Sequence, residues 1–169
     1  MAKSAFTEIP NAGGVNLVLT RMAYSSSSAQ ITIAGGTAGI WVPTGISVTI
    51  TPSAADKYIY VTGSFVSSNS QYPNTFRLVR GVTAVSIGTG AVGTTLNYGS
   101  MLPSVGTAME YGATFSIKAY DLPAVTTPVT YSLQASGAAN ASYVNTNNGA
   151  PFTIGGITQL AAFEIQPDA

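Results

Sequence analysis

Short runs of alternating apolar and polar residues recur along this chain, and several of them end at a glycine or a proline. In the segment from Ile46 to Pro52, isoleucine and valine alternate with serine and threonine until the proline ends the run. Successive side chains of a strand point to opposite faces, so this period predicts a half-buried β-strand. No segment of about 11 residues shows helical spacing without Gly, Pro or a β-branched run. The pattern therefore predicts an all-β fold.

The run from Phe76 to Ile87 alternates in the same way but contains a glycine near its middle. Alternation places Arg77 and Arg80 on opposite faces of the first half, which argues against a shared anion site. Glycine tolerates positive φ, so Arg80-Gly81 is predicted as a turn between two antiparallel strands. The local unit of the fold is therefore expected to be a β-hairpin.

Similar patterns predict most of the remaining strands. They are expected at 15–24, 31–33, 58–65, 94–97, 114–120, 129–133, 142–145 and 157–165. Loops are expected at 25–28, 67–73 and 135–141, where small and polar residues cluster. In the last strand, Leu160 and Phe163 are expected inside, with a bulge or a change of face between them. Many short strands without an internal repeat predict a jelly-roll β-sandwich of about eight strands.

The first residues do not follow this pattern. Met1–Gly14 shows no periodicity and ends in a Pro, Asn and Gly cluster, so it is expected to be an extended N-terminal arm. The remaining residues, 15–169, fit one domain, which at this size buries roughly 70% of the surface of its unfolded chain. No signal peptide or membrane span is expected, and the product is expected to be soluble and made inside a cell.

Charge is scarce in this chain. Charged residues make up 7% of the sequence, against ~25% in typical domains, while 46% of residues are hydrophobic and the net charge is zero. Nucleic-acid and anionic-membrane partners require a basic footprint, which is lacking. A surface with so few charges favours association with other subunits, so an oligomer is expected.

The residue inventory argues against catalysis. The chain contains no Cys and no His, which excludes thiolate and histidine metal sites as well as Ser-His-Asp and Cys-His nucleophiles. A glycine-rich stretch at 88–93 matches GxGxxG but precedes no helix, so no dinucleotide is expected. A glycosidase pair such as Glu110 and Asp121 is disfavoured. We expect no enzyme, no cofactor and no metal.

Nine tyrosines give the chain a different potential. An aromatic ring can stack on a sugar while its hydroxyl bonds outward, but tyrosines on the second face of a strand more often lie at a subunit interface. The residues expected at such an interface are Tyr58, Tyr60, Arg77, Tyr120 and Tyr131.

Several of these segments, in this order, resemble a family of small trimeric jelly-roll proteins of tailed bacteriophages. The family includes head decoration or cement proteins and terminal domains of tail fibres. The segments that carry the resemblance are 45–53, 57–61, 76–81, 120–123, 129–134, 143–145 and 163–165. The resemblance implies a homotrimer of tumour-necrosis-factor-like jelly rolls around a threefold axis.

On the basis of this resemblance, the first hypothesis is that the chain is a structural virion protein. The homotrimer would decorate or cement the capsid surface, and Phe6, Ile9 and Pro10 of the arm would contact the major capsid protein. The alternative is a tail-fibre or tail-tip protein that recognises host surface carbohydrate through loops such as 67–73 or 140–148. No shaft sequence is visible, which favours the first hypothesis.

Overall fold

The computed structural model describes residues 17–34, 40–69, 75–85, 100–101, 109–136, 142–145 and 156–167. Every regular element in these ranges is a β-strand, which confirms the all-β prediction. The strands are β1 (Leu17–Ser27), β2 (Ile31–Ile33), β3 (Val42–Ile50), β4 (Tyr58–Asn69), β5 (Thr75–Arg80), β6 (Thr83–Ala84), β7 (Ser100–Met101), β8 (Met109–Asp121), β9 (Val129–Ser136), β10 (Ser142–Val144) and β11 (Thr158–Pro167). The predicted arm and the predicted strand at 94–97 lie outside the described residues.

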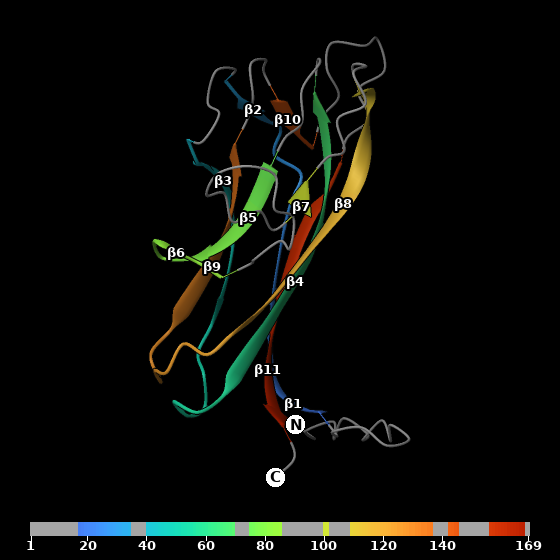
Figure 1. Ribbon diagram of the computed structural model, residues 1–169. Coiled ribbons are helices and arrows are strands. Elements are labelled where there is room, and N and C mark those ends of the chain that lie inside the picture. The colour runs from blue at the N-terminus through green and yellow to red at the C-terminus, as the bar shows by residue number, and fades with distance from the viewer. Residues whose placement is uncertain are drawn as a thin grey trace.

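The strands form two antiparallel sheets that face each other (Figure 1). One sheet has the order β1-β11-β4-β10-β2, with β8 also paired to β4, and the other has the order β3-β9-β5-β6, with β7 also paired to β5. The pairs β1·β11, β3·β9, β4·β8 and β5·β7 are nested along the chain, as in a long hairpin rolled up on itself. This nesting is the jelly-roll topology, so the predicted fold class is confirmed.

Residues of both sheets meet in one hydrophobic core. Phe65 on β4 and Phe76 on β5 face each other across the sandwich with ring centroids 4.3 Å apart, and Phe115 on β8 lies 5.8 Å from Phe65. Both Phe65 and Phe76 are fully buried, and the alternating residues Ile46, Val48 and Ile50 are buried as predicted. The aromatic cluster therefore joins the two sheets at their centre.

The predicted hairpin is present as β5 and β6. Arg80 pairs with Thr83, and Gly81 between them has a φ of +59°. A non-glycine residue is strained at such a φ, which explains the glycine at this turn. The turn residues are Gly81 and Val82, one position later than predicted.

The predicted loops are shorter than expected. Residues 25–27 belong to β1, 67–69 to β4, and 135–136 to β9, so these parts of the loop predictions are wrong. In each case a partner strand continues the hydrogen-bonded ladder, as where Ser25 pairs with Leu160. Small polar residues satisfy a ladder as well as apolar ones do, because the bonds join backbone atoms.

The predicted register of β11 is wrong at Phe163. Leu160, Ala162 and Glu164 are fully buried, so the inner face continues by simple alternation, and Phe163 points to the outer face. No bulge interrupts the pairing of β11 with β4; the irregularity lies instead in β1, between Leu19 and Arg21. The inner position next to Phe163 is taken by Glu164, although carboxylates are rarely found inside.

The aromatic cluster generates a stability prediction. We expect Phe65→Ala to lower the free energy of unfolding by about 3–5 kcal/mol, because it removes a fully buried ring that touches both sheets. Urea unfolding followed by fluorescence measures the change. Val82→Ala is the matched control, since Val82 is 97% exposed. Equal stability of the two variants would show that the cluster does not hold the sheets together.

Candidate functional site: the outer face of the β1-β11-β4-β8 sheet

A row of large apolar side chains crosses the outer face of this sheet. Met22 on β1 pairs with Phe163 on β11, Phe163 pairs with Tyr60 on β4, and Tyr60 pairs with Tyr120 on β8. The ring centroid of Tyr60 lies 4.7 Å from that of Tyr120 and 6.3 Å from that of Phe163. Direct cross-strand neighbours on one face interact most strongly, so the row is a continuous surface feature. We call Met22, Tyr60, Tyr120 and Phe163 the aromatic row.

The two ends of the aromatic row are open to solvent. Met22 is 63% exposed and Tyr120 is 62% exposed, while Tyr60 and Phe163 between them are half-buried. Leu19 and Tyr58, which lie toward the same end of the sheet, are also exposed. Exposed apolar side chains that lie together are a candidate contact surface.

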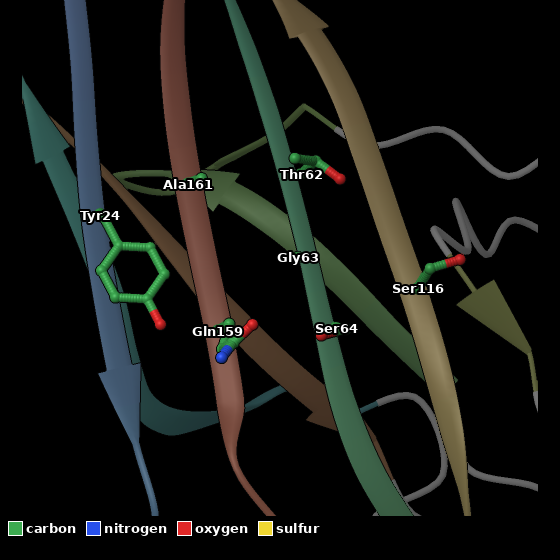
Figure 2. A pocket seen from close by; sticks show the side chains of 7 residues that line it. All are labelled: Tyr24, Thr62, Gly63, Ser64, Ser116, Gln159 and Ala161. Carbon is green, nitrogen blue, oxygen red and sulfur yellow. The ribbon is translucent and has the colours of Figure 1, made fainter.

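The same face becomes polar along the strands. The next row holds Tyr24, Ala161, Thr62 and Lys118, and the row after it holds Ser26, Gln159, Ser64 and Ser116. A shallow depression lies here, lined by Tyr24, Thr62, Gly63, Ser64, Ser116, Gln159 and Ala161 (Figure 2). The face therefore has an aromatic end and a hydroxyl-rich and amide-rich end.

The outer face of the opposite sheet has another character. Thr49 of β3 and Thr130 of β9 share a hydrogen bond of 2.8 Å between their hydroxyls. Arg77 of β5 donates from Nε to Gln134 Oε1 at 2.8 Å, and its guanidinium carbon lies 4.3 Å from the ring centroid of Trp41. Burial lowers the pKa of Arg77. These partners keep the guanidinium in place on a largely polar surface.

The structure separates the residues predicted for a subunit interface. It brings Tyr58, Tyr60 and Tyr120 together on the aromatic end of one sheet face, and places Arg77 on the outer face of the other sheet. Tyr131 is 0% exposed in the core, so its side chain does not reach an outer surface and the prediction for it is wrong. Alternation tells which residues of the strand share a face with Tyr131, but it does not tell which of the two faces is covered by the other sheet.

Sequence reasoning missed Met22 and Phe163 as members of the row. Their place follows from the pairing of the first strand with the last one, which no local pattern contains. The alternation of residues along the last strand would have placed Phe163 on the outer face. The sequence prediction placed it inside because phenylalanine is usually buried.

Tyr131 and Arg80 hold a buried polar cluster with Asp121 at one end of the core. Arg80 Nε donates to Asp121 Oδ2 at 2.7 Å, and the Tyr131 hydroxyl donates to the same oxygen at 2.8 Å. The pKa of Tyr131 is raised, mainly by burial and to a lesser extent by the hydrogen bond to Asp121. Two donors from the opposite sheet thus converge on one oxygen of the Asp121 carboxylate.

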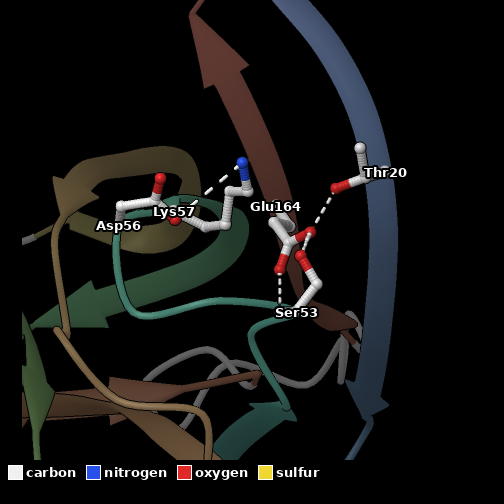
Figure 3. A network of polar contacts seen from close by, with 5 residues as sticks. All are labelled: Thr20, Ser53, Asp56, Lys57 and Glu164. Carbon is white, nitrogen blue, oxygen red and sulfur yellow. Dashed lines mark hydrogen bonds and ion pairs between the residues drawn. The ribbon is translucent and has the colours of Figure 1, made fainter.

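A second carboxylate, Glu164, is fully buried and joins three segments (Figure 3). Thr20 of β1 donates its hydroxyl to Oε1, and Ser53 donates its backbone N–H to Oε2 at 2.5 Å and its hydroxyl to Oε1 at 2.7 Å. Burial acts to raise the pKa of Glu164, but these hydrogen bonds and the charge of Arg21 outweigh it and hold the pKa below 4.5.

Within the described ranges, no three His, Cys, Asp or Glu residues lie close enough to hold a metal ion. The side chain of Glu110 is not among the described ones, so the glycosidase pair of Glu110 and Asp121, which the sequence disfavours, stays a prediction. The same ranges contain no helix of the length and apolarity needed to cross a membrane.

The chain matches no protein-family model and no curated protein. Among solved structures it is similar to the VP2 subviral particle of infectious bursal disease virus, with 12% identity, a TM-score of 0.38, and coverage of 88% of this chain and 42% of that one. The structure of the Gx strain of the same virus is similar at 13% identity and a TM-score of 0.40, over 94% of this chain and 42% of that one. The chain thus spans less than half the length of these proteins. The fold assignment rests on the strand order.

Glu164 yields a prediction about pH. The folded pKa is lowered, so the carboxylate stabilises the fold above its ordinary pKa of 4.5, and this contribution is lost as pH falls through the folded pKa. We expect Glu164→Gln to cost roughly 1–3 kcal/mol at pH 7, and this difference to shrink in acid. Urea unfolding at a series of pH values measures both.

The control for this prediction is Asp56→Asn, which removes a carboxylate whose side chain is 80% exposed and whose ion pair with Lys57 spans 3.9 Å. That variant should keep the wild-type pH profile. A Glu164→Gln curve parallel to wild type at every pH would contradict the assigned role of the carboxylate.

Proposed function

We propose that this chain is a structural virion protein that decorates the head of a tailed bacteriophage as a homotrimer. The observation that carries the proposal is the exposed aromatic row on one outer face of a jelly roll whose other outer face is polar. The row would lie between copies, and the polar face would point away from the axis.

Self-association is the simplest way to cover the aromatic row. The whole chain has only 7% charged residues, so little electrostatic repulsion opposes packing of one copy against another. Closed symmetric assemblies are the commonest form of soluble oligomers, and they bury the same surface of every copy. Buried aromatic and methionine side chains are also enriched at interface centres. The composition of the row, three aromatic rings and a methionine, fits this role.

The virion role is supported by the order of the segments that resemble phage decoration and fibre proteins, and by a residue inventory without a catalytic constellation. The major capsid protein would be the second partner, contacted by Phe6, Ile9 and Pro10. A trimer offers three arms, so weak contacts of each arm would add to firm binding through multivalency. The product would reside on the capsid surface after synthesis in the host cytoplasm.

The polar depression at the other end of the face favours a second candidate, a tail-fibre or tail-tip protein that binds host surface carbohydrate. Gold-labelled antibody against the chain, viewed on intact particles by electron microscopy, separates the two candidates. Label over the head supports decoration, and label confined to the tail supports the second candidate. Absence of label from every particle would contradict a virion role.

The proposed interface gives a prediction about mass. The wild-type chain should elute as a trimer in size-exclusion chromatography with light scattering. Met22→Ser combined with Tyr120→Ser should shift it toward the monomer, because the two residues are exposed in the subunit and lie at the two ends of the row. Val82→Ser, at a 97% exposed position of a distant turn, should leave the trimer intact. A wild-type monomer, or a double variant that remains trimeric, would contradict the assignment of the interface.

A further inference from the structure

The depression at the polar end of the sheet face has the composition of a ligand site. Its lining comes from β1, β11, β4 and β8, with the Tyr24 ring on one side and Gln159 beside it (Figure 2). Its volume of about 260 Å³ lies just below the range of sites for drug-sized ligands, roughly 300–1,000 Å³. The space suits a single small ring and is too small for a longer ligand to be enclosed.

Two polar side chains of the depression, those of Tyr24 and Gln159, are available to a ligand. Tyr24 is 56% exposed, and Gln159 is exposed as well. Within the described part of the chain, neither the Tyr24 hydroxyl nor the Gln159 carboxamide has a protein hydrogen-bond partner. Thr62 and Ser64 add two hydroxyls on the neighbouring strand. An amide and several hydroxyls provide both donors and acceptors beside one aromatic face.

The arrangement is also fixed by the fold. Gly63 lies between Thr62 and Ser64 with its backbone against Leu160, where an added Cβ would be 2.3 Å from Leu160 Cδ2. The buried Leu160 side chain therefore fills the space that a larger residue at position 63 would need. Because the side chains project from paired strands, their spacing is set by the sheet and not by a loop.

We propose that this depression binds one neutral pyranose ring of a glycan, stacked on Tyr24 and hydrogen-bonded by Gln159, Thr62 and Ser64. A sugar ring offers an apolar face for the tyrosine and a rim of hydroxyls that both donate and accept. Among the described residues, no charged side chain lines the depression, and Lys118 pairs with Thr62 without being part of the lining. Phosphate and carboxylate ligands therefore find no counter-charge there.

The inference does not depend on where the chain sits in a particle, since decoration and fibre proteins could both carry such a site. It also uses residues outside the aromatic row. Sugar binding and self-association can therefore fail separately.

The test is a titration of the full isotopically labelled chain with methyl glucoside, methyl galactoside, methyl mannoside and N-acetylglucosamine, followed by NMR chemical shifts. We expect at least one sugar to give saturable shifts centred on Tyr24, Thr62, Ser64 and Gln159. Tyr24→Ala should weaken that binding about 5- to 10-fold through loss of stacking. Tyr24→Phe should retain most of it.

Tyr120→Ala is the matched control, because it removes an exposed tyrosine from the same sheet face outside the depression. It should leave sugar affinity unchanged even if it alters the mass of the assembly, which light scattering records in parallel. The proposal is overturned if none of the four sugars gives saturable shifts, if the shifts lie elsewhere, or if Tyr24→Ala binds as wild type does. Tighter binding of sialic acid than of every neutral sugar would overturn the assignment of a neutral ligand.

Discussion

The antiparallel register of β4 with β11 and β8 determines both the core and the outer face of this protein. Tyr60 pairs with Phe163 on one side and with Tyr120 on the other, so one register builds the aromatic row. The alternate residues Ile59 and Val61 are fully buried on the opposite face. A slip by one residue would exchange the two faces, exposing the core and burying the row. Core packing thus fixes which side chains the protein presents to its surroundings.

Two carboxylates, the fully buried Glu164 and the partly buried Asp121, connect this central register to the rest of the sandwich. Glu164 ties β11 to Thr20 of β1 and to Ser53 in the turn before β4, while Asp121 receives Arg80 and Tyr131 from the opposite sheet. A buried charge is costly unless it is fully hydrogen-bonded, and the structure supplies such partners to both. In a chain with so few charges, these two carboxylates stabilise the packing of the two sheets.

Local patterns predicted much of this fold. The run from Ile46 to Pro52 and the hairpin around Gly81 were recognisable because alternation and turn chemistry act over a few residues. The jelly-roll order needed the pairing of β1 with β11, which depends on contacts far apart in the sequence. The tyrosines of β4 and β8 could be predicted as interface candidates from local alternation. Met22 and Phe163 could not, because their place in the row depends on this distant pairing. Tyr131 was misplaced since alternation alone does not tell which face of a strand another sheet will cover.

Hydroxyl-radical footprinting of the full chain, read by mass spectrometry at high and low protein concentration, tests most directly whether copies cover the aromatic row. The account predicts that oxidation of Met22 and Tyr120 slows several-fold in the assembled sample. Ile40, which is 60% exposed, should react equally in both. Oxidation of Met22 and Tyr120 at the same rate in the assembled and the diluted chain would contradict the account.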